Sequence, residues 1–450
     1  MIPLPLGAIG SATLVHGNPE LAVTGVVADS RLAQQGSLFV CLPGSRADGH
    51  DFIDDAACRG AVAILAAPGR SPRAVVLAAL ESAEPLTTLA EVGRLVRARS
   101  GARVIGIAGS AGKTTVKDVL HALLAPHLPT VASRASHNNE LGVPLTLALL
   151  EPETAACVCE LGTGAPGELA ALCATAQPDL GVVTAIGPEH LEFFGSVEGV
   201  AAEEAALLAA LPPAAPVILP FGEPLLDPYR RSDLDEWRFG LDHRADVHPL
   251  AWRPHADSAD LTLAVRGRRV ELTTNLRLPH HRLSLAAAAA AYAALGLPLD
   301  GLGEGAETIA LSSWRGEEQR LRRGALLIND AYNANPLSLR AALEALAARR
   351  NGGRAIAVLG PMAELGRETA RWHALAGRQA GELGVDLLVA VGPGARGYLD
   401  GATGRVVCLW FPDLDSAIAP LRSLLERDDV VLLKGSRAAG LERLAQALAQ

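Results

Sequence analysis

The chain has 450 residues, and at roughly 150 residues per domain this length predicts about three domains. Its 40 basic and 49 acidic residues leave a formal net charge of −9. This charge argues against a nucleic-acid-binding protein, because such proteins usually carry a basic surplus on at least one domain. Hydrophobic residues make up 49% of the chain and charged residues 20%, so the chain can build sizeable cores and is not disordered.

The cysteines and the apolar segments indicate a protein of the reducing cytosol. The six cysteines are too few and too scattered for a disulfide framework. Residues 1–15 have no basic region before their mildly apolar stretch, so they make a poor signal peptide. The longest nearly apolar run, residues 283–299, is rich in alanine and contains Pro298, which favours a buried helix over a membrane span. We therefore expect a cytoplasmic protein that does not bind membranes.

Residues 1–99 alternate short apolar runs with turn signals. The runs at 36–42 and 60–66 predict strands, and residues 51–60 between them predict a short helix. Residues 86–101 have helical spacing and end on a glycine, which predicts a helix leading into the next domain.

Residues 100–308 repeat a strand–loop–helix pattern, which predicts a mainly parallel sheet covered on both faces. Residues 259–274 alternate differently and predict an antiparallel hairpin appended to this domain. The expected strands cover residues 103–109, 156–162, 180–186 and 215–220, and the expected helices cover residues 113–127, 167–176 and 199–211.

Residues 309–450 start the pattern again and predict a doubly wound α/β domain. The expected strands are 325–330, 354–360, 386–392 and 429–435, with helices between them.

A glycine-rich loop after the strand expected at 103–109 is the strongest local signal. Backbone N–H groups in such a loop point at phosphate oxygens, and the N-terminus of the following helix adds positive potential. We expect Lys113 to bridge the terminal phosphates of ATP and the Thr114 hydroxyl to ligate Mg²⁺. The loop is shorter than the strict G-x4-G-K-[ST] pattern. The residues expected to hold the nucleotide are Gly109, Ser110, Ala111, Gly112, Lys113, Thr114 and Thr115.

The lysines are unusually rare, since only Lys113, Lys117 and Lys434 occur among the 40 basic residues. Because the chain uses arginine for nearly every other cation, each lysine that remains is more indicative of a specific role. A compact ammonium suits a position among phosphates better than the planar fork of arginine does.

Several segments together resemble the Mur ligase family, the ATP-dependent enzymes that extend the cell-wall peptide. The shortened loop is the form found in that family, and the other segments follow in the family's order over nearly the whole chain. They are 27–61 in the first domain, 136–147, 159–169 and 187–201 in the second, and 328–339, 358–366 and 432–437 in the third.

The resemblance implies a three-domain α/β fold with a central P-loop ATPase-type parallel sheet and a C-terminal Rossmann-like domain. It implies an amide ligase that transfers the γ-phosphoryl group of ATP to a carboxylate, after which an amine attacks the acyl phosphate. The motifs YNANP and NNELGVP point to the last amino-acid-adding step, with a UDP-muramoyl-peptide and a dipeptide amine as substrates. We expect a monomer with a hinge near residues 301–315, because Arg315 must reach a phosphate held by Lys113.

The resemblance also implies roles for individual residues. Glu160 and His190 match the ligands of a second Mg²⁺, and Arg315 and Asp330 match a pair that closes over the nucleotide. With Lys113, these four form the expected catalytic set. The residues that match the substrate sites are Asp29, Ser30 and Arg31 for the uridine diphosphate, Asn138 and Asn139 in the second domain, and Asn333, Asn335 and Pro336 for the dipeptide.

The chain departs from the family at several of these positions. Glu204 stands where the family often carries a lysine that CO₂ converts to a carbamate, a group that helps to bind Mg²⁺. Glu204 is therefore an expected metal ligand or a solvated helix carboxylate. Arg282 replaces an asparagine on the adenine side, and Pro361 and Asn329 replace aspartates. These departures leave open a relative that joins a different carboxylate and amine in a specialised pathway.

Three other interpretations compete with this one. Residues 392–397 match G-x-G-x-x-G, but without the usual acidic partner they indicate a structural strand-to-helix turn rather than a dinucleotide site. Cys157 and Cys159, with Cys173, could suggest zinc, but they flank Val158 on one face of a buried strand, which favours core packing. The third alternative is a binding protein that has lost catalysis.

Overall fold

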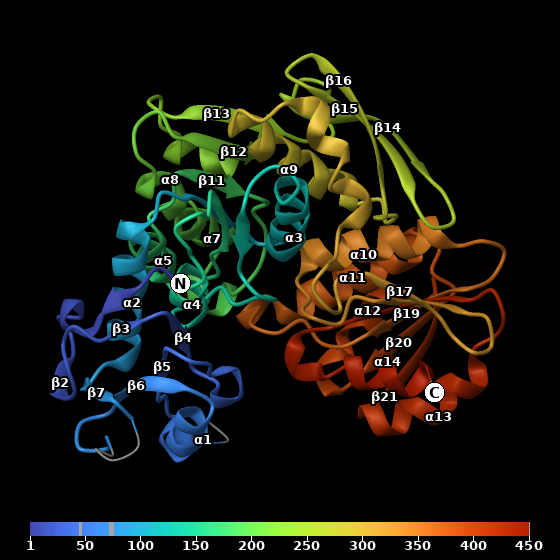
Figure 1. Cartoon of the computed structure of the whole chain (residues 1–450). Helices are drawn as coiled ribbons and strands as arrows, with labels where there is room; N and C mark the ends of the chain where they lie inside the picture. Colours follow the sequence, from blue (N-terminus) through green and yellow to red (C-terminus); the bar gives the residue numbers. More distant parts are fainter. Residues whose placement is uncertain (45–46, 72–75, 450) are drawn as a thin grey trace.

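The computed structural model describes residues 1–44, 47–71 and 76–449, which form three large β-sheets with helices packed on them. A small antiparallel ribbon of β1 (Leu4–Pro5) and β3 (Ala22–Val23) accompanies the first sheet. Figure 1 shows the first sheet at lower left, the second above it and the third at right. Each sheet uses one continuous part of the chain, which confirms the prediction of an α/β protein with three domains.

The first sheet is mainly parallel, and only its edge strand β2 is antiparallel to its neighbour. Both strands predicted here are confirmed. The predicted helix at 51–60 begins as a 3-10 turn at Gly49–Phe52, because the side chain of Asp48 caps this turn by accepting from the His50 N–H. In spatial order the strands are β2 (Thr13–His16), β7 (Ala78–Glu81), β6 (Ala61–Ala66), β5 (Ser37–Val40) and β4 (Gly25–Val27), and the helices are α1 (Ile53–Cys58) and α2 (Pro85–Arg99).

The second sheet is parallel from its β9 edge to β14 and antiparallel beyond. The hairpin predicted at 259–274 is confirmed, and it extends this sheet through β14. In spatial order the strands are β16 (Arg268–Thr274), β15 (Ala259–Val265), β14 (Val247–Pro254), β13 (Asp235–Phe239), β12 (Pro216–Pro220), β11 (Leu180–Val183), β8 (Arg103–Ala108), β10 (Ala156–Glu160) and β9 (Thr130–Ala132).

The helices predicted at 113–127 and 167–176 are present in the second domain, whereas α4 and α6 were not predicted. The helix expected at 199–211 is two short helices that meet at Ala205. The helices are α3 (Lys113–Leu124), α4 (Gly142–Leu147), α5 (Glu168–Ala176), α6 (Leu191–Phe194), α7 (Val197–Glu204), α8 (Ala206–Ala210) and α9 (His281–Ala294).

Helix α9 is the buried helix predicted from the alanine-rich run. Residues 286–291 are all alanine and are all fully buried, and α9 lies against α3 and the strands of the second sheet. Alanine lets helices approach closely because its side chain ends at Cβ. The packing of α3, which carries Lys113 at its first turn, therefore depends on these small residues. In the parts of the chain that the structure describes, no helix is long and apolar enough to span a membrane.

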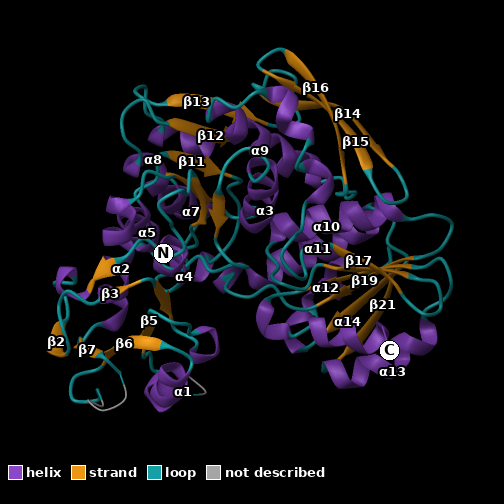
Figure 2. Cartoon of the chain, viewed as in Figure 1, coloured by secondary structure: helices purple, strands orange, loops and turns teal. Residues whose placement is uncertain are grey.

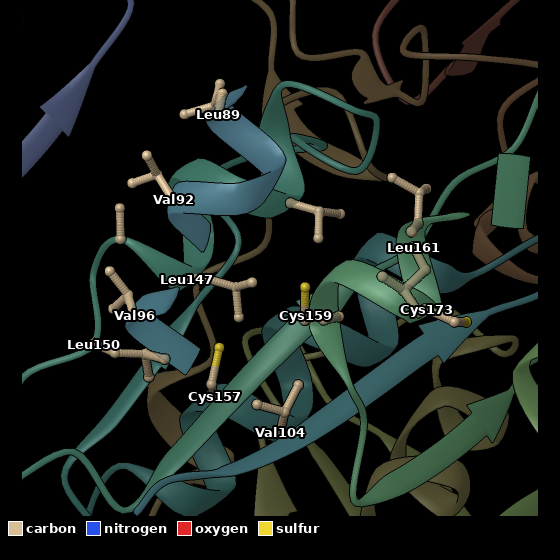
Figure 3. Close-up of a cluster of buried hydrophobic side chains, with 14 of the residues drawn as sticks. Leu89, Val92, Val96, Val104, Leu147, Leu150, Cys157, Cys159, Leu161 and Cys173 are labelled. Atoms are coloured by element: carbon tan, nitrogen blue, oxygen red, sulfur yellow. The ribbon is translucent and has the colours of Figure 1, made fainter. Parts of the chain in front are cut away.

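Helix α2 attaches the first domain to the second. Leu89, Val92 and Val96 on α2 are buried in the same hydrophobic cluster as Cys157 and Cys159 on β10 (Figure 3). Both cysteines are fully buried and contribute to this cluster, as the alternation about Val158 predicts. The cluster therefore joins the two domains through apolar packing.

The third domain is doubly wound, as predicted, with helices on both faces of its sheet (Figure 2). All pairs are parallel except β17 with β18 at one edge. In spatial order the strands are β17 (Glu317–Arg320), β18 (Leu326–Asn329), β22 (Val430–Lys434), β19 (Ala355–Leu359), β20 (Leu387–Val391) and β21 (Val407–Phe411), and the helices are α10 (Pro336–Arg349), α11 (Thr369–Glu382), α12 (Gly397–Ala402), α13 (Leu414–Leu424) and α14 (Glu442–Ala449).

The glycine-rich segment at 392–397 is a structural turn, as expected. Gly392 follows β20 with a φ of +93°, a 3-10 turn covers Pro393–Ala395, and α12 begins at Gly397. Strand β21 follows this unit and was not predicted.

The alanines of α9 give the first testable prediction. Ala288→Leu places extra methyl groups where no space exists, so we expect it to destabilise the second domain by about 1–3 kcal/mol. Ala348→Leu, at an exposed position of α10, is the matched control and should be nearly neutral. The measurement is the thermal unfolding midpoint of both variants. Equal midpoints would show that close approach of α9 is not required.

Candidate active site

The phosphate loop lies between β8 and α3, at the carboxyl end of a strand inside the second sheet. Gly109 has a φ of +120°, and a Cβ there would lie 2.4 Å from Thr184 Oγ1. Gly112 has a φ of +85° and directly precedes α3. The Ser110 N–H donates to the Ala185 carbonyl at 2.7 Å. The two glycines thus permit a tight turn against β11 that delivers Lys113 to the start of the helix.

Lys113 is surrounded by carboxylates. Its ammonium donates to the Gly109 carbonyl and lies 3.8 Å from Glu189 Oε1. Burial by itself lowers the pKa of Lys113, but three nearby carboxylates more than offset this and raise the pKa above its usual value. They belong to Glu189, Glu204 and Glu160. The lysine therefore stays cationic in the loop.

Thr114 and Glu160 form a chain of oxygen donors beside the lysine. The Thr114 hydroxyl donates to Glu160 Oε1 at 3.1 Å, and Asn138 Nδ2 donates to the same oxygen at 2.8 Å. The other oxygen of Glu160, Oε2, is buried and has no hydrogen-bond partner. Glu160 is the last residue of β10, so its place at the sheet edge follows from the strand.

The third domain contacts this loop directly. Arg315 Nη2 donates to Thr114 Oγ1 at 3.0 Å, and its guanidinium lies 4.0 Å from the centre of the Tyr332 ring. Asn335 Nδ2 donates to the Ser110 carbonyl at 2.8 Å. The Oδ1 of Asn335 also accepts from the Ser338 N–H and caps α10. The second and third domains are therefore in direct contact at the loop in this structure.

Asp330 lies behind this contact. Its carboxylate accepts from Lys434 Nζ at 2.6 Å, and Lys434 also donates to the Asn333 carbonyl at 3.0 Å. Burial lowers the pKa of Lys434, and the Asp330 carboxylate opposes that shift. The pair holds the start of the 330–335 loop in place.

His190 and Glu364 connect the second and third domains. His190 has a left-handed backbone with a φ of +47°, and its Nδ1 contacts the Glu364 carboxylate. The Glu192 N–H donates to the Glu364 carbonyl at 3.0 Å. The imidazole is partly exposed, so Nε2 is the nitrogen left for another ligand.

Many of these residues, among them Lys113, Glu160 and Arg315, line one cavity of about 330 Å³. It brings together residues from the second and third domains that lie up to 228 positions apart, between Ser110 and Ser338. Eight of its lining residues were not singled out from the sequence, and Glu189 and Tyr332 are two of them. The predicted residues that line it are Ser110, Ala111, Gly112, Lys113, Thr114, Asn138, Asn139, Glu160, His190, Arg315, Asn333 and Asn335.

Of the residues predicted in the second and third domains, five do not line this cavity. Gly109 and Thr115 flank the loop, and Asp330 is linked to it through Lys434. Glu204 is fully buried behind the loop, where its Oε2 accepts from the Gly109 N–H at 2.6 Å. Pro336 begins α10.

The residues predicted for uridine diphosphate lie apart, in the first domain. Asp29 caps the 3-10 turn at Ser30–Leu32 and pairs with Arg31 at 2.6 Å. The hydrogen bond with Arg31 lowers the pKa of Asp29 below its usual value. Arg31 is exposed and its guanidinium is open to a ligand.

Comparison with known proteins covers nearly the whole chain. Family models match at residues 22–107 (Mur ligase family, catalytic domain), 107–293 (Mur ligase middle domain) and 314–437 (Mur ligase, glutamate ligase domain). The UDP-N-acetylmuramoyl-tripeptide–D-alanyl-D-alanine ligase of Mycobacterium tuberculosis strain H37Rv is 36% identical over 95% of this chain and 92% of its own length. The ligase of that name from Escherichia coli K12 is 32% identical over 95% and 94%.

Solved structures agree with these relatives. A MurF structure from Acinetobacter baumannii has a TM-score of 0.83 at 29% identity and covers 95% of this chain and 94% of its own. A MurF ligase from Thermotoga maritima in complex with ADP has a TM-score of 0.81 at 26% identity and covers 94% and 97%. The loop, the cavity and these likenesses agree: the chain belongs to the Mur ligase family.

Proposed function

We propose that this protein joins D-alanyl-D-alanine to UDP-N-acetylmuramoyl-tripeptide in peptidoglycan precursor synthesis, with ATP converted to ADP and phosphate. The observation that carries this proposal is the match, over about 95% of the chain, to ligases of that name. The cavity supports it, because the phosphate loop meets Arg315 and residues 332–335 there.

The cavity suits acyl phosphate chemistry. A carboxylate does not condense with an amine without activation, so the γ-phosphoryl group is first moved from ATP to the carboxylate. The amine nitrogen then attacks the acyl carbon, and phosphate leaves from the tetrahedral intermediate. Catalysis of this kind depends on positioning and on neutralising charge. In our proposal Lys113 and the loop N–H groups hold the phosphates, and Arg315 stabilises the charge that develops on them.

The oxygen donors in the cavity fit magnesium. The Thr114 hydroxyl and the unpartnered Oε2 of Glu160 are hard oxygen ligands, which Mg²⁺ prefers together with phosphate oxygens and water. His190 would add a nitrogen through Nε2. In the described parts of the chain no three His, Cys, Asp or Glu residues are already grouped around a metal position, so we propose that phosphate oxygens of the nucleotide complete the site. Bound Mg²⁺ would supply charge neutralisation at the phosphates.

The remaining residues are assigned to binding. We propose that Asn138, Asn139 and Asn333 face the substrates, and that Asp29, Ser30 and Arg31 hold the uridine diphosphate. Asn335 is used for capping α10 and for holding the third domain on the loop. Asp330 acts through Lys434 on the loop that ends at Asn335.

We further propose domain boundaries at 99/100 and 308/309, a monomeric state and a cytoplasmic location. The separate sheets support the boundaries, since β2–β7, β8–β16 and β17–β22 pair within their own groups. The need for ATP and a uridine-linked precursor supports the location.

Amine specificity tests the function directly. With UDP-muramoyl-tripeptide and ATP, phosphate release should require D-alanyl-D-alanine and should be at least tenfold slower with L-alanyl-L-alanine or single amino acids. The measurement is phosphate release together with mass spectrometry of the product. Turnover with another amine, and none with D-alanyl-D-alanine, would favour a ligase of a specialised pathway.

The phosphate loop is tested by Lys113→Arg. Because the guanidinium is broader than an ammonium and cannot act as a point charge between phosphates, we expect ATP turnover to be nearly abolished. Arg103→Lys, an exposed exchange on the strand that leads into the loop, should leave turnover unchanged. Lys113→Arg turnover within about tenfold of the unmodified protein, or ~1.4 kcal/mol of barrier, would refute the assignment.

The metal ligands are tested by Glu160→Ala and His190→Ala. Nucleotide binding should persist, but both variants should need more Mg²⁺ for half-maximal phosphate release, because each loses a ligand of the ion. Glu153→Ala and His243→Ala remove exposed side chains of the same types and serve as controls. If the Mg²⁺ dependence of both variants equals that of the controls, neither residue holds the metal.

A further inference from the structure

Two glutamates meet behind and beside the phosphate loop. Glu204 ends α7 and is fully buried, with its Oε2 on the Gly109 N–H at 2.6 Å. Glu189 lies in the connection between β11 and α6 and is 7% exposed. The two carboxyl groups are close enough to interact electrostatically, and both lie near the Lys113 ammonium. Burial raises the pKa of both, and the nearby Lys113 ammonium opposes that shift.

Only one of the pair reaches the cavity. Glu189 lines it, and Glu204 does not. The Oε1 of Glu189 is buried without a hydrogen-bond partner and lies 3.8 Å from Lys113 Nζ. Glu204 has one oxygen on Gly109 and a second that is also unpartnered. The arrangement is therefore a front carboxylate facing the cavity and a rear carboxylate fastened to the loop backbone.

The front carboxylate needs a cation when the site is loaded. Without a nucleotide, the Lys113 ammonium is the cation beside Glu189. In the function proposed above, that ammonium instead binds the phosphates of ATP. A buried carboxylate left without a partner is costly. Mg²⁺ commonly binds through one or two carboxylates, with phosphate oxygens and water in its other positions. The carboxylates of Glu160 and Glu189, both facing the cavity, satisfy this requirement.

Glu204 is poorly placed for the same task. The carbamate of a lysine at this position would reach further from α7 by about three bonds, or roughly 3–4 Å. The glutamate is shorter, and its Oε2 is already occupied by the backbone of the loop. The carboxylate oxygen that would face the metal therefore comes from Glu189, in the connection between β11 and α6.

Resting on the proposed function, we infer that Glu189 is a magnesium ligand at the phosphate loop and that Glu204 is its positioning residue. Glu204 holds the Gly109 N–H and supports the Glu189 carboxyl from behind. Together they replace a CO₂-derived ligand with two ordinary side chains. Metal binding by this protein therefore does not depend on bicarbonate.

Metal binding is measured directly with Mn²⁺ as a spectroscopic substitute for Mg²⁺. Titration of Mn²⁺ into the full chain with saturating ADP, followed by electron paramagnetic resonance, gives the affinity without any peptide substrate. We expect Glu189→Gln to lower the affinity for Mn²⁺ at least tenfold. Glu204→Gln should lower that affinity about threefold. Metal-free ADP binding should not fall in either variant, since a negative charge near the phosphates is removed.

Control variants separate this effect from general damage. Glu192→Gln removes an exposed charge three residues from Glu189 and should bind Mn²⁺ normally. Glu189→Asp keeps the charge on a shorter side chain and should bind Mn²⁺ better than Glu189→Gln does. Unfolding midpoints identify any variant that fails to fold, and Glu189→Asp then supplies the test. Stripping CO₂ or adding bicarbonate should leave the Mn²⁺ affinity of the unmodified protein unchanged.

Two results would overturn the inference. One is a Mn²⁺ affinity of folded Glu189→Gln within twofold of that of the unmodified protein. That result would mean that Glu189 pairs with Lys113 in the absence of nucleotide and does not bind the metal. The other is Mn²⁺ affinity that rises with bicarbonate. Failure of the proposed function is a separate result, because it appears as absent D-alanyl-D-alanine-dependent phosphate release while the Mn²⁺ measurements stand.

Discussion

The closing of the third domain onto the phosphate loop is the contact on which the rest of this site depends. The loop supplies Lys113, but the cavity is complete only because Arg315 reaches Thr114 and Asn335 reaches the Ser110 carbonyl. These hydrogen bonds join residues about 200 positions apart. They require the 330–335 loop to be held firmly, which the buried Lys434–Asp330 pair does. Neither domain alone would present these groups to a nucleotide.

The rarity of lysine in this chain has a structural counterpart. All three lysines are buried or nearly so, and each is held by defined acceptors around the same region. Lys117, for example, donates to the carbonyls of Ser133 at 2.9 Å and Ala135 at 2.6 Å and pairs with Asp118 at 2.8 Å. A rotatable ammonium can satisfy several convergent oxygens, whereas a planar guanidinium imposes its own geometry. Lysine is thus retained where several oxygens converge on one point charge.

Three carboxylates around the phosphate loop are buried although their hydrogen bonding is incomplete. Glu160, Glu189 and Glu204 each leave one buried oxygen without a partner. Such groups cost stability unless a partner reaches them. The hydrophobic clusters that join α2 to β10 and α9 to α3 provide the rigid frame that tolerates this cost.

The sequence by itself determined the local elements and the phosphate loop. Strand and helix periodicity predicted the α/β class, the three domains and the buried α9, because these depend on patterns within short segments. The loop was recognisable because its glycines, Lys113 and Thr114 are neighbours in the chain. The split of the helix at Ala205, strand β21 and the continuous path from the hairpin into the second sheet were not visible, since neighbouring elements decide them.

Only the tertiary structure decided which carboxylate faces the cavity. The family resemblance offers Glu204 as a metal ligand, because it stands where the family often carries a lysine. The fold turns Glu204 toward the Gly109 N–H and brings Glu189, from the connection after β11, to the front. Asn335, which matched a substrate position in the sequence, lines the cavity and also caps α10 and contacts Ser110. Direction and distance between side chains on different elements depend on how those elements pack, and no pattern along the chain records that.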